Sequence, residues 1–139
     1  MYTYEYPHPA VTADAVVFGF DGKSLNLLLI NRGIEPYKGS WALPGGFINI
    51  NETAEDGALR ELKEETGVED IYLEQFHTFT AVDRDPRERV MTIAFLAFIR
   101  QDDYSVVAGD DAAKAQWYPV DKLPELAFDH EEIIKMALD

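Results

Sequence analysis

Three glutamates, Glu61, Glu64 and Glu65, have the spacing of neighbours on one face of a helix. Side chains at positions i, i+3 and i+4 emerge close together, so each pair of carboxylates repels by about 0.2–0.5 kcal/mol. A bound Mg²⁺ or Mn²⁺ would turn that repulsion into a coordination site, because hard ions prefer oxygen ligands and are often shared with substrate phosphates. The alternative interpretation is a solvated helix face.

The residues beside these glutamates favour the metal site. Arg60 directly precedes Glu61 and can orient a carboxylate through a bidentate pair. Gly57 lies one turn before Glu61, where a glycine costs about 1 kcal/mol relative to alanine. We expect glycine there because a side chain would fill space that a ligand needs.

A longer pattern surrounds the glutamates. From Gly46, five residues lead to Glu52, seven more lead to Arg60-Glu61-Leu62, and single residues then separate Glu64-Glu65 and Gly67-Val68. This pattern resembles the Nudix box, the signature of the Nudix hydrolase family. The resemblance implies an α/β fold, an α/β/α sandwich with a mixed β-sheet between helices. It also implies metal-dependent cleavage of a nucleoside diphosphate linked to another moiety.

The resemblance implies a role for each matching residue. The metal ligands would be three carboxylates and one backbone carbonyl: Glu61, Glu64, Glu65 and Gly45. Arg60 resembles the residue that braces the glutamates, and Glu52 the one that ties the loop to the helix. Metals that bridge two phosphates polarise the P–O bond and lower the pKa of an attacking water. Replacing Glu64 with glutamine is therefore expected to abolish turnover.

The general base has two sources in this family, a box glutamate or a carboxylate on a later loop. The local candidates in this chain are Asp110 and Asp111. We favour Asp111, which lies six residues before Trp117. The alternative for this pair is a solvated turn.

Substrate contacts are predicted from the resemblance outside the box. Residues 41–47, 84–87, 108–112 and 126–130 resemble the group that contains bacterial ADP-ribose pyrophosphatases and Nudix-related regulators of NAD metabolism. Arg32 resembles an arginine that contacts substrate phosphate, the alternative being a surface arginine. Arg84 and Arg87 lie on a loop that can reach a phosphate or ribose, and Phe128 would stack on a base or else plug the core. His130 is not favoured as a base, because it sits in a first helical turn without an evident partner.

The elements that must position these residues are predicted from periodicity. The clearest helix covers residues 54–66, with Leu59, Leu62 and Thr66 toward a sheet and Gly67 as its left-handed stop. Strands are expected over 13–20, 25–30, 71–82, 89–99 and 117–120, with loops over 31–40 and 101–114. A last helix should begin near Phe128, with Asp129 and Glu132 in capping-box register.

Composition limits the class of protein. The chain has 139 residues, a size that predicts one domain over residues 1–139. Its net charge of -14 repels nucleic acid and anionic lipid, so neither is an expected partner. The absence of cysteine and of an N-terminal signal pattern favours a cytoplasmic protein. The longest apolar run, residues 93–99, is far shorter than the roughly 20 residues of a membrane span.

The predicted function is hydrolysis of ADP-ribose to AMP and ribose 5-phosphate with Mg²⁺ or Mn²⁺. One alternative is a nucleoside triphosphate pyrophosphohydrolase. The other is an ADP-ribose-sensing regulator without catalysis. Such regulators carry a winged-helix DNA-binding domain after the Nudix domain, whereas this chain stops at Asp139 and is strongly acidic. The family resemblance implies a homodimer.

Overall fold

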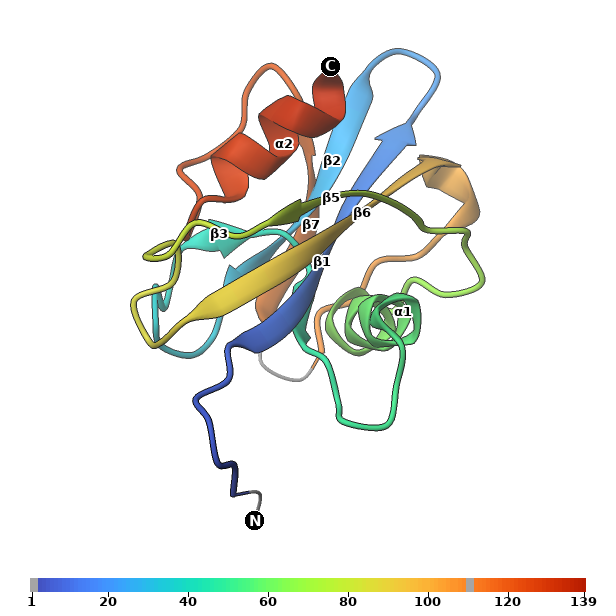
Figure 1. Ribbon diagram of the computed structural model, residues 1–139. Helices are drawn as coiled ribbons and strands as arrows, with labels where there is room; N and C mark the ends of the chain where they lie inside the picture. The colour runs from blue at the N-terminus through green and yellow to red at the C-terminus, as the bar shows by residue number, and fades with distance from the viewer. Residues whose placement is uncertain (1–2, 110–111) are drawn as a thin grey trace.

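A mixed β-sheet forms the centre of the molecule in this computed structural model, which describes residues 3–109 and 112–139. Among these residues one α-helix covers each face of the sheet (Figure 1). The strands are β1 (Ala10–Phe20), β2 (Leu25–Arg32), β3 (Trp41–Ala42), β4 (Gly45–Phe47), β5 (Glu74–Phe79), β6 (Val90–Arg100) and β7 (Ala112–Pro119). The helices are α1 (Ala54–Thr66), a short 3₁₀ turn η1 (Gln101–Asp103) and α2 (His130–Leu138).

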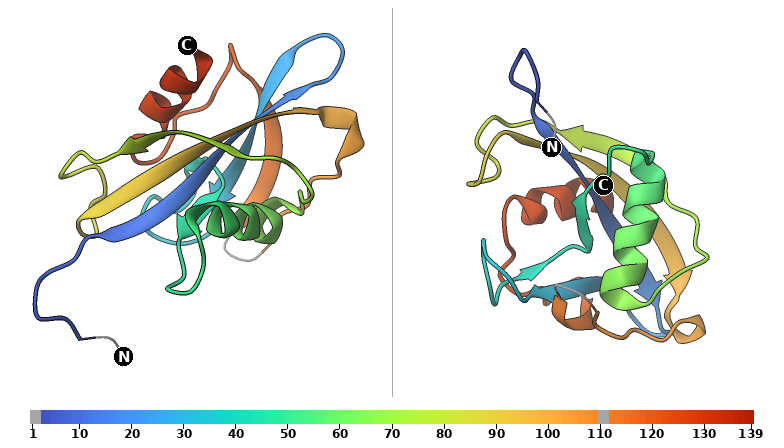
Figure 2. Two further views of the ribbon diagram at one scale, coloured as in Figure 1. Left: turned by 45° about the vertical axis from the view of Figure 1, so that its right-hand side comes forward. Right: turned by 90° about the horizontal axis from the view of Figure 1, so that it is seen from below.

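The strand order along the sheet is β3-β2-β1-β6-β5, while β4 also pairs with β1 and β7 also pairs with β2. The β1–β6 pair is parallel and the other pairs are antiparallel. Figure 2 shows α1 and α2 on opposite sides of this sheet. The predicted α/β/α sandwich with a mixed sheet is therefore confirmed.

The central strand β1 supplies both halves of the core. Successive side chains of a strand point to opposite faces. Accordingly Ala15 and Val17 pack in the cluster beneath α1, whereas Val16 and Phe18 pack in the cluster beneath α2. By the same alternation Asp14 belongs to the α2 face, where an acid in a buried strand needs polar partners.

Helix α1 begins and ends where the sequence predicts. The hydroxyl of Thr53 accepts a hydrogen bond from the backbone N–H of Asp56 at 3.1 Å, which caps the first turn. Gly67 has φ 78° and its N–H bonds the carbonyl of Lys63, which ends the helix. Leu62 and Thr66 are fully buried, so the predicted sheet-facing side is also confirmed.

Helix α2 differs from the prediction at its start. It begins at His130, and the predicted capping box is wrong, because the side chain of Asp129 makes no capping bond. The Asp129 carboxylate instead accepts two hydrogen bonds from Arg84, at 2.8 and 2.6 Å. A bidentate bond to a charged guanidinium is stronger than one to a neutral backbone amide.

Three strands have bounds that the local sequence does not reveal. β5 is shorter than the predicted 71–82, β2 continues to Arg32, and β7 starts at Ala112 within the predicted polar loop. β7 pairs with β2 from Asn26–Pro119 to Arg32–Ala112. This long-range pairing gives β7 a strand conformation that its polar residues do not signal.

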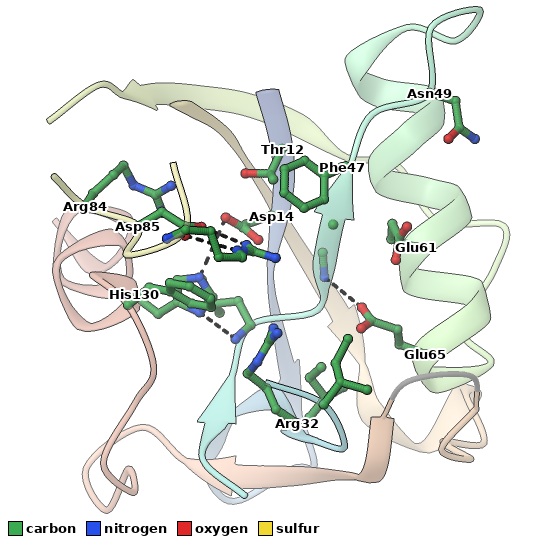
Figure 3. Close-up of a pocket in the computed structure, with 17 residues that line it drawn as sticks. Thr12, Asp14, Arg32, Phe47, Asn49, Glu61, Glu65, Arg84, Asp85 and His130 are labelled. Carbon is green, nitrogen blue, oxygen red and sulfur yellow. Dashed lines mark hydrogen bonds and ion pairs between the residues drawn. The ribbon is translucent and has the colours of Figure 1, made fainter. Parts of the chain in front are cut away.

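The described residues contain no helix that is long and apolar enough to cross a membrane. The N-terminal segment before β1 leads away from the body of the molecule, as both figures show. The loop between β3 and β4, the second half of α1 and the start of α2 line the cleft described next (Figure 3).

Candidate active site

A cleft of about 330 Å³ lies between α1 on one side and the loop 80–89 and the start of α2 on the other (Figure 3). The acidic wall consists of Glu61 and Glu65 from α1 with Gly45 and Gly46 from β4. The basic wall consists of Arg32 at the end of β2 with Arg84 and Arg87 from the loop between β5 and β6. Two walls of opposite charge therefore face one space.

The acidic wall is packed tightly against both of its backbone positions, Gly45 and Gly46. A Cβ on Gly46 would lie 2.7 Å from the carboxyl carbon of Glu61. A Cβ on Gly45 would overlap the Asp14 carboxylate and the Ala13 carbonyl. Glycine thus lets the backbone of β4 lie directly against carboxylates.

Glu65 is the buried acid of this wall. It is 6% exposed, and its Oε1 accepts a hydrogen bond from the Gly45 N–H at 2.8 Å. Burial raises the pKa of Glu65 to about 8, and the negative charges of Glu61 and Asp14 act in the same direction. At neutral pH this carboxyl holds a proton that a bound cation would replace.

Arg60 binds the carboxylates behind the acidic wall. Its Nη2 donates to Glu52 Oε1 at 2.7 Å, and its Nη1 donates to Glu61 Oε1 at 2.7 Å and Glu64 Oε2 at 3.2 Å. The bond to Glu52 is the main reason that the pKa of Arg60 is raised. Glu52 also accepts from the N–H of Asn49, so it joins the preceding loop to α1.

The donors of this wall fit a hard divalent ion. No three Asp, Glu or His side chains in the described ranges already form a metal cluster. However, two carboxylates and the glycine backbone line one cleft, and all of them offer oxygen ligands of the kind that Mg²⁺ and Mn²⁺ prefer. A buried acid with a raised pKa beside a second acid is also a place where a cation is favoured.

Two guanidiniums of the basic wall lie close to each other. Nε of Arg32 donates to the Pro36 carbonyl at 2.6 Å, and Arg87 forms an ion pair with Asp85 at 2.7 Å. Burial lowers the pKa of Arg32, and the positive charge of Arg87 lowers it further. An anion bound between them would relieve this repulsion.

Arg84 has a different environment from the other two arginines. Its side chain is only 3% exposed and is held by the bidentate bond to Asp129. It therefore joins the loop between β5 and β6 to the start of α2, at the back of the basic wall.

Phe128 supports the exposed side of the basic wall. The guanidinium carbons of Arg32 and Arg87 lie 5.1 and 5.5 Å from the centre of its ring, within cation–π range. Arg87 also lies 4.8 Å from the ring of Phe47. The backbone of Phe128 has φ 53°, which turns the chain just before α2. Its ring therefore lines the cleft as well as packing beside the small core cluster around Ala127.

Comparison with known proteins identifies the family. The model of the NUDIX domain matches residues 8–137. The chain belongs to the Nudix family. It is 42% identical over 130 residues to a Methanocaldococcus jannaschii protein named ADP-ribose pyrophosphatase, and the match covers 94% of this chain and 73% of that protein. Nudix hydrolases in general use divalent metals.

Two further Nudix relatives are a protein named as a repressor and a solved domain in complex with ADP ribose. The ADPR responsive transcriptional repressor NtrR of Acinetobacter baylyi is 34% identical over 137 residues, and this chain spans only 54% of its length. The solved NUDIX domain of Shewanella oneidensis NrtR, complexed with ADP ribose, has a TM-score of 0.87 and 33% identity. That match covers 96% of this chain and 88% of the solved domain.

The structure brings most of the residues predicted from the Nudix resemblance to one cleft. Those that line it are Gly45, Glu61, Glu65, Arg32, Arg84, Arg87 and Phe128. Glu52, Arg60 and Glu64 form the hydrogen-bonded group behind the acidic wall, where the Glu64 side chain is 41% exposed. Asp111, the predicted general base, lies outside the described residues.

Our explanation of Gly57 is wrong. A Cβ at this position would lie 3.0 Å from Glu52 Oε1 and 3.4 Å from Ile48 Cγ1. The space beside Gly57 is thus taken by the protein's own loop rather than kept for a ligand. Glycine here allows Glu52 to reach Arg60.

Sequence reasoning missed several residues of the cleft. Asp14 and Asp85 are both 6% exposed and line it, and His130 does so at 4% exposure. The view that His130 has no partner is also wrong, since its Nδ1 accepts from the Leu43 N–H at 3.0 Å and its Nε2 lies 3.7 Å from Asp14 Oδ2. An aspartate inside the apolar strand was the available signal for Asp14, but its partners are remote in sequence.

Proposed function

We propose that this chain hydrolyses the pyrophosphate linkage of a nucleoside diphosphate derivative, with ADP-ribose cleaved to AMP and ribose 5-phosphate. The observation that carries the proposal is the single cleft in which the acidic wall faces the basic wall. A diphosphate between the walls would meet guanidiniums on one side and a metal-binding surface on the other. The name of the Methanocaldococcus relative and the ADP ribose in the Shewanella complex support this choice of substrate.

The proposed cofactor is Mg²⁺ or Mn²⁺. Its proposed ligands are three carboxylates and one backbone carbonyl: Glu61, Glu64, Glu65 and Gly45. When bound, such an ion neutralises charge on the diphosphate and lowers the pKa of an attacking water. Arg60 would hold Glu61 and Glu64 in place, and Glu52 would hold Arg60, as their hydrogen bonds support.

The basic wall would bind the substrate. Arg32 and Arg87 are assigned to the phosphates, because their neighbouring charges favour an anion between them. Phe128 is assigned to the base, on which its ring would stack. Arg84 remains in the substrate-binding set because it lines the cleft, with its guanidinium fixed by Asp129. Asp111 remains the proposed general base on the Nudix resemblance alone.

Product analysis tests this proposal. The purified chain is incubated with Mg²⁺ and a panel of ADP-ribose, other nucleoside diphosphate derivatives and nucleoside triphosphates, and the products are identified by mass spectrometry. We expect AMP and ribose 5-phosphate from ADP-ribose, and no product after chelation of the metal. Fast turnover of a triphosphate without turnover of ADP-ribose would replace the proposal with a triphosphate pyrophosphohydrolase.

The second candidate is an ADP-ribose-sensing regulator, which the similarity to the Acinetobacter repressor favours. The acidic set of Glu61, Glu64 and Glu65 and the net charge of -14 support catalysis over DNA binding. A gel shift with DNA at physiological salt, with and without ADP-ribose, separates the two. We expect no retarded band; DNA binding without hydrolysis would establish the regulator.

We further propose a single domain over residues 1–139, a homodimer, a cytoplasmic location and no nucleic-acid or membrane partner. The formal charge of -14 supports the last of these, because it repels anionic polymers and lipids. Light scattering on the purified protein tests the oligomeric state, with the mass of two chains expected.

A further inference from the structure

The backbone from Leu43 to Gly45 is held by a separate hydrogen bond at each residue. The Leu43 N–H donates to His130 Nδ1 at 3.0 Å. The Pro44 carbonyl accepts from the Ala15 N–H at 2.9 Å, and the Gly45 N–H donates to Glu65 at 2.8 Å. Of these three contacts, only the one at Leu43 comes from the α2 side of the cleft (Figure 3).

The ring of His130 is oriented by groups on two elements. Because Nδ1 accepts a hydrogen bond, the proton of the neutral ring is on Nε2. That nitrogen lies 3.7 Å from Asp14 Oδ2, and the same oxygen accepts from Thr92 Oγ1 at 2.6 Å. Thr92, Asp14, His130 and Leu43 thus form a continuous polar row from β6 through β1 to the backbone before β4.

This row is buried in the α2 half of the core, where an apolar residue would pack without needing polar partners. His130 and Asp14 are 4% and 6% exposed, and Thr92 is fully buried. Burying polar groups costs free energy unless each is hydrogen-bonded. The row ends at a backbone N–H two residues before Gly45, the residue whose carbonyl is a proposed metal ligand.

We infer that His130 is a positioning residue for the metal site: through Leu43 it orients the Gly45 carbonyl, and Asp14 orients the His130 ring. The inference rests on the proposed function, because it assumes that Gly45 belongs to a divalent-ion site. His130 itself neither contacts the ion nor transfers a proton in this account. Residues that orient metal ligands typically change affinity or activity by roughly 10- to 100-fold when replaced.

Two amide variants separate the hydrogen bond of Nδ1 from the contact of Nε2 with Asp14. In His130→Asn the amide oxygen takes about the place of Nδ1 and accepts from Leu43. In His130→Gln the amide reaches about the place of Nε2, toward Asp14, and the Leu43 N–H is left without its acceptor. Both variants lose the buried imidazole, so thermal unfolding and circular dichroism control for stability.

The test measures the Mn²⁺ dissociation constant by electron paramagnetic resonance. We expect His130→Asn to bind Mn²⁺ within about threefold of the wild type, and His130→Gln to bind it roughly 10- to 100-fold more weakly. The kcat of His130→Gln for ADP-ribose should recover largely at saturating metal, because its defect lies in the metal site. Equal Mn²⁺ affinity in wild type and both variants, or equal loss in both variants, would overturn the inference.

A second test uses only the wild-type protein and so does not depend on whether a variant folds. In ¹⁵N-labelled protein, Mg²⁺ should shift the Leu43 and Gly45 amide resonances and His130 Nδ1 together. If Mg²⁺ shifts the Gly45 amide resonance and leaves the resonances of Leu43 and His130 unchanged, the inference is overturned while the proposed function stands. A wild-type chain that binds neither ion would remove the proposed function, and the inference with it.

Discussion

The two sides of the cleft are built from different parts of the chain. The contacts of the acidic wall are local, since Gly45–Glu65 and Arg60–Glu52 are separated by 20 and 8 residues. On the other side, Arg84–Asp129 spans 45 residues and Leu43–His130 spans 87. One side is thus a continuous segment from β4 to α1, whereas the other brings together β2, the loop between β5 and β6 and the start of α2.

This difference suggests that the acidic wall holds the metal and the basic wall holds the substrate. A continuous segment can hold several ligands at a fixed spacing, which suits a metal site. The remote segments come together on the side of the cleft that is proposed to bind the substrate. We therefore expect substitutions in the acidic wall to reduce kcat and substitutions in the basic wall to raise KM or reduce stability.

Among the four comparisons that follow, the largest effect is expected for Glu65→Gln. The glutamine oxygen can still accept from Gly45, so the fold should persist, but the carboxyl that gives up its proton to the ion is lost. If the ion contributes several kcal/mol of charge stabilisation, kcat for ADP-ribose should fall about 10³-fold. Steady-state kinetics at several Mg²⁺ concentrations measure this, with circular dichroism as the control. Near wild-type kcat would remove Glu65 from the site.

Arg84→Ala should act on stability instead. Removing one partner of a buried ion pair typically costs about 3–5 kcal/mol, because the other charge is left uncompensated. Asp129 would be that charge, with its side chain only 14% exposed. Urea unfolding compares this variant with Lys135→Ala, whose pair with Glu131 is exposed and should change stability by less than about 0.5 kcal/mol. Similar stability in both variants would contradict the structural role of Arg84.

Arg87→Ala should mainly raise KM. A charged hydrogen bond to phosphate contributes about 1.5–3 kcal/mol, so KM for ADP-ribose should rise roughly 10- to 100-fold with a smaller change in kcat. Lys135→Ala is the matched loss of a positive charge on α2 outside the cleft lining, and its KM should equal that of the wild type. A drop in kcat at constant KM would assign Arg87 to the chemical step.

A last effect is a pH dependence of stability in the metal-free protein. Folded Glu65 has a pKa of about 8, whereas its ordinary value is 4.5, so between these values the folded state binds more protons than the unfolded state. Its contribution to the free energy of unfolding therefore falls as pH rises from about 4.5 to about 8. The difference between wild type and Glu65→Gln in urea unfolding should show this slope. Parallel pH profiles would contradict the raised pKa.

The two sides also differ in how far the sequence predicts them. The spacing of Glu61 and Glu65 and the stop at Gly67 place α1 correctly, because helix periodicity and capping are local properties. Local patterns also predict the mixed sheet, and the Nudix resemblance predicts the arginines of the basic wall. They miss the start of β7 and the partners of Asp14 and His130, because those depend on contacts between residues far apart in the chain, such as Arg32 with Ala112, Leu43 with His130 and Asp14 with His130.

Local reasoning fails in a different way at Gly57 and Asp129. From the local sequence, Gly57 is expected to leave a gap for a ligand and Asp129 to cap a helix. In each case a charged side chain that is close in space determines the contact instead: Glu52 occupies the gap beside Gly57, and Arg84 binds Asp129. Arginine–carboxylate pairs are strong enough to override such local preferences.

Anomalous scattering from crystals of the chain grown with Mn²⁺ and a non-hydrolysable ADP-ribose analogue tests the central claim most directly. The account predicts a manganese peak at coordination distance from the carboxylates of Glu61 and Glu65 and from the Gly45 carbonyl, with the diphosphate between it and Arg87. A manganese peak outside the cleft, or an analogue bound with those glutamates turned to solvent, would contradict it.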